Sequence, residues 1–148
     1  NILIKYLNAP NLLRYDSIII SHTSPYRLHV NKHPIHSNDP LHKDSDLIYS
    51  DIEEHSKSNQ DLLPILEYYK KYYDLDYAIF IHNLICEKID NLTQHFPVLH
   101  LINFEWSHLY QFSNMLSFES VFKAHRGNMN HFSCEGNSIV FEEIKKHL

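Results

Sequence analysis

The segment near the end of the chain holds the residues best suited to chemistry. His131 stands three residues after Asn128 and just before a predicted helix. A histidine at a helix start can turn one ring nitrogen toward an acceptor and the other toward a nucleophile, as general-base catalysis requires. We therefore expect His131 to act as a base that Asn128 orients. A neutral amide cannot stabilise the imidazolium as an aspartate does, so either another group supplies the orientation or the site is slow or inactive.

The residues around His131 resemble the last motif of the SGNH/GDSL hydrolases. The stretch 127–137 reads GNMNHFSCEGN and is followed directly by the predicted helix. The family pattern is Asp-x-x-His, with a glycine or another small residue five positions after the histidine, which is the general base for a serine nucleophile. His131 falls on the histidine position, Gly136 on the small-residue position and Asn128 on the aspartate position.

A second stretch, 15–27, resembles the strand and turn that carry the family's Gly-x-Asn-Asp motif. Thr23 stands where the family has the asparagine that donates to the oxyanion, and Ser24 stands at the aspartate position. The resemblance implies a catalytic contribution from Thr23 and a substrate-lining position for Ser24. Tyr26 and Arg27 follow this turn, and they either contact an anion or a sugar of the substrate or form a solvated turn. The family's Gly-Asp-Ser nucleophile segment and its oxyanion glycine have no counterpart in this sequence.

The apolar patterning indicates elements that alternate between strand and helix. Short apolar runs predict buried strands at 17–21, 77–82 and 98–104. Helical spacing predicts helices at 61–74, 84–92 and 135–147, with a further short helix at 2–14 and a helical turn near 46–55 inside a long polar loop over 22–60. Residues 105–126 have only weak helical patterning. This order predicts a three-layer α/β/α sandwich around a parallel sheet, of SGNH or flavodoxin-like type.

In such sheets the ligand site lies beyond the carboxyl ends of the strands. The residues expected there are 21–24, 82–83 and 103–106. His82 is therefore a candidate substrate-binding residue, although a histidine that ends an apolar strand is more often a satisfied core residue.

Length and glycine content limit the architecture. The 148 residues fit one domain over 1–148. Average usage of about 7% would give about ten glycines, but the chain has two, Gly127 and Gly136. This excludes a phosphate-binding Walker loop, a dinucleotide-binding turn and a nucleophile elbow. Because the first residue is Asn1 and an apolar stretch follows at once, we expect an N-terminally truncated domain that lacks its first strand.

Charge and composition exclude several function classes. The net charge of −5, without a basic block, argues against a nucleic-acid surface, and no apolar run reaches the length of a membrane span. His29, His33, His36 and His42 cluster, but Pro34 breaks their helical spacing, so no metal site and no cofactor are expected. The two cysteines are expected to be reduced, and a cytoplasmic location is the default, although a missing N-terminus would hide a signal peptide.

Three functional hypotheses follow. The first is an ester hydrolase acting on an acyl or acetyl ester of a carbohydrate or lipid, with its serine upstream of Asn1 and His131 as base. The second is a non-catalytic SGNH-like domain for carbohydrate binding or assembly, which Thr23 and Asn128 favour because both depart from the family pattern. The third is an unrelated α/β domain in which His131 is structural. The sequence leaves the substrate and the oligomeric state open.

Overall fold

The computed structural model describes Leu7, Lys43 and residues 12–40, 45–103, 109–127 and 131–148. Its contacts divide the chain into two compact units. Unit 1 comprises Asn1–Thr23 and His82–Leu148, and unit 2 comprises Ser24–Ile81. The prediction of a single domain over 1–148 stays a prediction, and each unit is described by itself.

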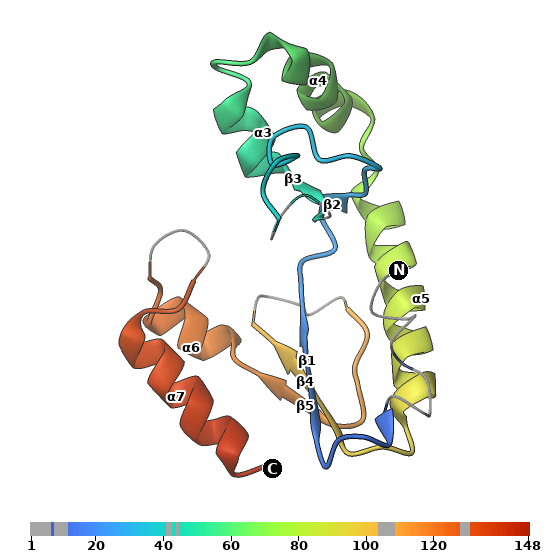
Figure 1. The fold of residues 1–148 in the computed structure, drawn as a ribbon, viewed down its shortest axis with the longest axis vertical. Helices are drawn as coiled ribbons and strands as arrows, with labels where there is room; N and C mark the ends of the chain where they lie inside the picture. The colour runs from blue at the N-terminus through green and yellow to red at the C-terminus, as the bar shows by residue number, and fades with distance from the viewer. Residues whose placement is uncertain (1–6, 8–11, 41–42, 44, 104–108, 128–130) are drawn as a thin grey trace. The chain divides into compact units, whose positions relative to one another are not determined.

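The described residues of unit 1 form a three-stranded parallel sheet in the order β1-β4-β5 (Figure 1). The strands are β1 (Ile18–His22), β4 (Val98–Ile102) and β5 (Met115–Ser117). The register pairs Ile18 with Val98, and His100 with Met115. All five residues of the central strand β4 are buried, as expected for a parallel strand covered on both faces.

Helices cover both faces of this sheet. On one face, Cys86 and Ile89 of α5 (Leu75–Thr93) pack with Ile20, Val98 and Ile102. The opposite face is covered by α6 (Glu119–Ala124) and α7 (Cys134–Lys145). The residues of the second cluster are Leu99, Leu101 and Phe118, with Val121, Phe132, Val140 and Ile144 packed against them. The described part of unit 1 is therefore a mixed α/β arrangement around a parallel sheet, which confirms the predicted α/β class at this level.

The prediction of a strand at 77–82 is wrong, because these residues belong to α5. The Asp74 side chain accepts a hydrogen bond from the Tyr77 backbone N–H at 2.9 Å and so caps the helix. Tyr77 and Phe80 are 61% and 56% exposed, whereas a parallel strand would be buried on both faces. His82 therefore lies within a helix and not at a strand end, which removes the argument that placed it in the site.

Unit 2 contains more regular structure than the predicted loop at 22–60. The short strands β2 (Arg27–Leu28) and β3 (Leu47–Ile48) pair antiparallel, and β3 leads into α3 (Tyr49–His55), which confirms the predicted helical turn. A 3₁₀ turn, η1 (Gln60–Leu62), precedes α4 (Leu63–Tyr72). The core of unit 2 consists of Leu47, Ile52, Leu62 and Leu66.

The other predictions vary in outcome. Strands β1 and β4 and helices α4 and α7 lie within a few residues of their predicted ranges. Strand β5 and helix α6 lie in the segment 105–126, which has only weak helical patterning. The helix predicted at 2–14 falls mostly outside the described residues.

Candidate functional site

The turn before α7 is held by backbone contacts on both sides of His131. Arg126 and Phe132 form an antiparallel bridge, and the Gly127 N–H donates to the carbonyl oxygen of His131 at 2.8 Å. The His131 side chain is exposed. His131 thus presents an accessible imidazole from a position whose own backbone carbonyl is hydrogen-bonded to Gly127.

Both glycines of the chain, one before the turn and one in α7, lie where a Cβ would meet nearby atoms. A Cβ at Gly127 would lie 2.7 Å from the carbonyl oxygen of Phe132, and one at Gly136 would lie 2.9 Å from the Cβ of His125. Neither neighbour is the flexible end of a side chain, so the backbone would have to shift to accept any larger residue. The sequence motif therefore has a steric reason for its two small residues.

Ser133 begins the last helix as its N-cap. Its hydroxyl oxygen accepts a hydrogen bond from the Gly136 N–H at 3.1 Å. We expect Ser133→Ala to lower the free energy of unfolding by about 1 kcal/mol, because that N–H loses its partner. Ser138→Ala is the matched control, since Ser138 lies inside α7 and its hydroxyl donates to the Cys134 carbonyl and not to a backbone N–H at the helix start. Urea denaturation measures both, and an equal loss in the two variants would contradict the capping role.

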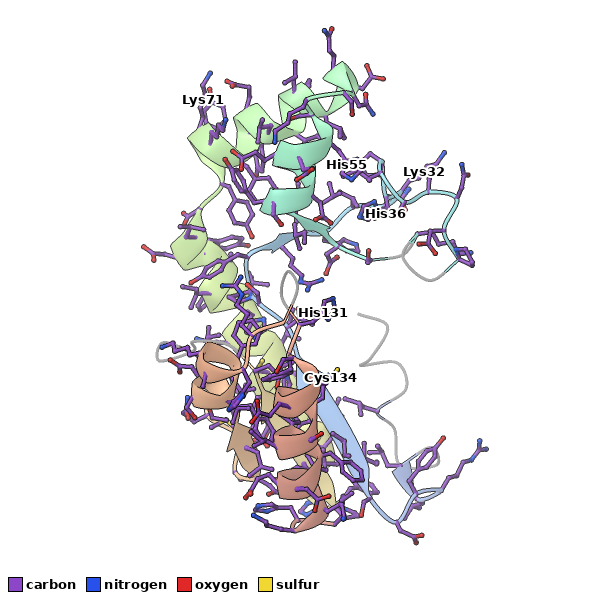
Figure 2. All side chains as sticks on the ribbon, turned by 90° about the vertical axis from the view of Figure 1, so that its left-hand side faces the viewer. Lys32, His36, His55, Lys71, His131 and Cys134 are labelled. Carbon is purple, nitrogen blue, oxygen red and sulfur yellow. The ribbon has the colours of Figure 1, made fainter. Side chains whose placement is uncertain are left out.

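His131 lies at the end of unit 1 toward which the parallel strands run. Strands β1 and β4 run toward the end at which α7 begins (Figure 1), and Figure 2 shows His131 there, beside the start of α7. Asn128 lies outside the described residues. The carboxylate of the motif, Glu135, lies 3.3 Å from Nδ1 of His125.

The residues predicted after β1 divide between the two units. Thr23 belongs to unit 1, whereas Ser24, Tyr26 and Arg27 belong to unit 2. The Ser24 hydroxyl oxygen accepts from the Tyr26 N–H at 3.2 Å, and the Arg27 carbonyl accepts from the Tyr73 hydroxyl at 3.2 Å. Within unit 2, the Ser24 contact closes a short turn and the Tyr73 contact ties Arg27 to the residue that ends α4.

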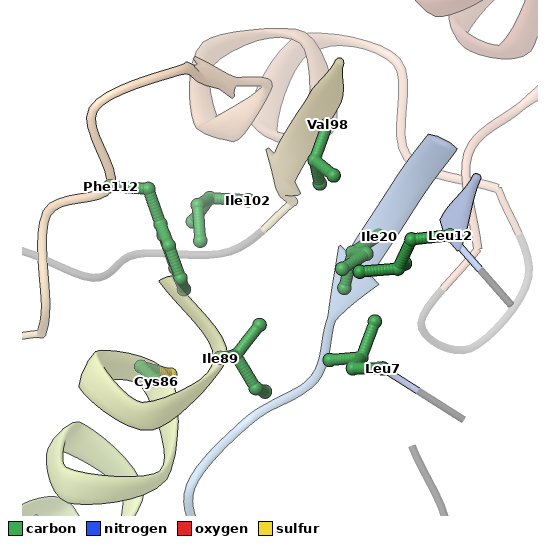
Figure 3. Close-up of a cluster of buried hydrophobic side chains, with 8 residues drawn as sticks. All are labelled: Leu7, Leu12, Ile20, Cys86, Ile89, Val98, Ile102 and Phe112. Carbon is green, nitrogen blue, oxygen red and sulfur yellow. The ribbon is translucent and has the colours of Figure 1, made fainter. Parts of the chain in front are cut away.

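A buried polar cluster, which the sequence did not predict, lies on the α5 side of the sheet. Nε2 of His22 lies 2.9 Å from Nδ1 of His100, and Nδ1 of His22 lies 4.0 Å from the Cys86 sulfur. The His100 ring stacks on Phe112 with centroids 3.9 Å apart. Figure 3 shows Cys86 and Phe112 together with the other buried side chains of the same apolar cluster. We call His22, His100 and Cys86 the buried histidine cluster.

Burial keeps the buried histidine cluster neutral. It lowers the pKa of His22 to about 3, with smaller contributions from His100 and His82. Burial also lowers the pKa of His100 and raises that of the Cys86 thiol to about 12. The thiol can then donate to Nδ1 of His22, and Nε2–H of His22 can donate to His100, without any charge. Because the thiolate is the reactive form, Cys86 is not an activated nucleophile.

The sequence offered one signal for this cluster. His100 interrupts an otherwise apolar strand, VLHLI, and His22 ends the strand IIISH at a buried position. A polar residue at an inward position of a buried strand needs a hydrogen-bonding partner, and the parallel register places Ile20 opposite His100, so that His22 lies two positions further along. Only the pairing of the strands shows that these two residues meet.

The described histidines of unit 2 make local contacts. His29 pairs with Asp46 at 3.0 Å, and Nδ1 of His33 accepts two backbone N–H groups. His42 lies outside the described residues. Among the residues that the structure describes, no group of three or more histidine, cysteine or acidic side chains could hold a metal ion.

Comparison with family models, curated proteins and solved structures gives no match. The site is therefore characterised by its own geometry. None of the described helices is long and apolar enough to cross a membrane.

Proposed function

We propose that this protein hydrolyses a carboxylic ester of a carbohydrate or lipid, with His131 as the general base. One observation carries the proposal: His131 is exposed just before α7, with its backbone carbonyl bonded to Gly127, at the end of unit 1 toward which β1 and β4 run. Ligands of parallel α/β sheets bind at this end. The resemblance of the motif 127–137 to the SGNH hydrolases supports the same role for His131.

The chemistry proposed is acyl transfer to a serine followed by hydrolysis. The His131 imidazole takes the hydroxyl proton as the serine oxygen bonds to the ester carbonyl carbon, and it returns that proton to the leaving alcohol. Water then cleaves the acyl-serine by the same sequence, which releases the acid and restores the serine. The family resemblance places this serine on a strand before the stretch 15–27. Thr23 is proposed as a hydrogen-bond donor to the carbonyl oxygen.

The test is ester hydrolysis by the complete gene product. Turnover of p-nitrophenyl acetate and butyrate is measured for the unsubstituted protein and for His131→Ala, with circular dichroism as a check of folding. We expect His131→Ala to lower kcat by about 10²-fold or more, because general-base catalysis contributes at least that much. The matched control is His95→Ala, an exposed histidine of unit 1, which should retain full turnover. Unchanged turnover in His131→Ala would overturn the proposal.

The alternative is a domain of the same fold that binds carbohydrate without catalysis. It is favoured by the contact of Glu135 with His125, because this carboxylate then serves a residue other than the proposed base. Thr23 also favours the non-catalytic function, since it stands where the family has asparagine. Absence of ester hydrolysis in the unsubstituted protein, together with measurable binding of a neutral oligosaccharide, would support this second function and exclude the first.

A further inference from the structure

Ser21 and Asn103 meet at the carboxyl end of the sheet. Ser21 is the fourth residue of β1, and Asn103 follows the last residue of β4. The Asn103 side-chain N–H donates to the Ser21 hydroxyl oxygen at 3.2 Å. This hydrogen bond joins the ends of two neighbouring strands through side chains that the proposed role of His131 does not use.

Ser21 lies on the same face of the sheet as the turn of His131. Side chains alternate along a strand, and in β1 Ile20 and His22 are buried whereas Ser21 is exposed. Ser21 pairs with Leu101, which belongs to the cluster that α7 and Phe132 cover. The Ser21 hydroxyl and the turn at His131 therefore share one face and one end of unit 1.

The hydrogen bond from Asn103 orients the Ser21 hydroxyl, which can still donate its own hydrogen. Because a lone pair of its oxygen is occupied by Asn103, the hydroxyl hydrogen is free to point elsewhere. Among the described residues, the Asn103 side-chain oxygen is buried and accepts no hydrogen bond. A buried polar atom without a partner is costly and uncommon. Among the described residues, the hydrogen bond to Ser21 is the one side-chain interaction shown for this amide.

We propose that Ser21 donates a hydrogen bond to the ester carbonyl oxygen as that oxygen becomes negatively charged, and that Asn103 is the positioning residue that orients the Ser21 hydroxyl. The inference rests on the proposed ester hydrolysis. A fixed donor aimed at the developing oxyanion stabilises the transition state more than the ground state. Ser21 forms no covalent bond in this role, so the nucleophile is a different serine.

The test measures kcat and KM of the complete gene product with p-nitrophenyl butyrate. We expect Ser21→Ala to lower kcat by about 10- to 100-fold with little change in KM, since the lost donor acts in the transition state. Ser21→Thr keeps the hydroxyl and should recover most of kcat. Ser138→Ala, on the exposed side of α7, is the control and should have full activity.

A double substitution separates positioning from a merely structural effect. Asn103→Ala should lower kcat less than Ser21→Ala, and it should have no further effect on kcat in the Ser21→Ala variant, because both act through one hydroxyl. Independent, multiplicative losses would overturn the positioning role of Asn103. Unchanged kcat in Ser21→Ala would overturn the role of Ser21.

Two further outcomes distinguish this inference from the proposed function. If the unsubstituted protein hydrolyses no ester, both fail. If hydrolysis requires His131 but not Ser21, only this inference fails. Labelling with a fluorophosphonate probe identifies the nucleophile, and Ser21→Ala should still be labelled; complete loss of labelling would make Ser21 the nucleophile and exclude the oxyanion role.

Discussion

Lowering the pH from 7 to 5 is expected to destabilise unit 1 by about 2 kcal/mol through His22 alone. The pKa of His22 is about 3 in the folded chain, because the ring is buried, and 6.5 is the ordinary value. Between these two values the unfolded chain binds a proton that the folded chain does not. The stability from the neutral ring is therefore complete above pH 6.5 and is lost as the pH falls toward 3.

Two other histidines of unit 1 also destabilise the folded state as the pH falls. Burial lowers the pKa of His100 and of His82, so each also favours the folded state less as the pH falls. The slope for one such histidine is at most about 1.4 kcal/mol per pH unit. The window of pH 5 to 7 lies above the range in which ordinary carboxyl groups titrate, so the histidines dominate the change.

Hydrogen exchange read by mass spectrometry at pH 7, 6 and 5, corrected for the intrinsic exchange rate, measures this loss on peptides from β1 and β4. The variant His22→Leu/His100→Leu replaces both rings with apolar side chains of similar size, and its stability should depend less on pH in this window. His95→Gln, at an exposed position of unit 1, should keep the original pH dependence. A pH dependence that is the same in the double variant as in the unsubstituted protein would contradict the role assigned to the buried histidine cluster.

Local sequence patterns predicted the elements whose burial is regular along the chain. β4 is a run of five buried residues, and α7 begins at a serine whose hydroxyl caps the helix, so both could be read from a few neighbouring residues. The run 77–82 could not, because apolar periodicity in a short segment does not separate a buried strand from a helix. Asp74 was the missing signal, since its side chain caps the helix that contains the run.

The elements that were missed depend on contacts distant in sequence. β5 has three residues and is defined by its pairing with β4, so its own composition says little. The same applies to the candidate site. The sequence indicated His131 through its motif, but the meeting of Ser21 with Asn103 requires the parallel register of β1 and β4. A pattern along the chain identifies a residue type, whereas only the register shows which side chains share an edge.

Replacing His33 with leucine is expected to destabilise unit 2 by about 2 kcal/mol or more. His33 is 2% exposed, and its Nδ1 accepts hydrogen bonds from the backbone N–H groups of Ile35 at 3.2 Å and His36 at 2.9 Å. Accepting two donors requires a lone pair on Nδ1, so the proton of the neutral ring is on Nε2. Leucine fills similar space but accepts neither hydrogen bond, and a partly buried N–H without a partner costs about 1–3 kcal/mol.

The conservative variant His33→Asn separates hydrogen bonding from packing. The asparagine side-chain oxygen is attached at the same position as Nδ1, so it can accept from both N–H groups although it fills less space. We expect it to be more stable than His33→Leu in urea denaturation, despite being the smaller and more polar substitution. His29→Leu, at a mostly exposed position, is the control and should change stability by less than about 0.5 kcal/mol. If His33→Leu were as stable as the unsubstituted chain, or more stable than His33→Asn, the two backbone hydrogen bonds would not be what holds this segment of unit 2.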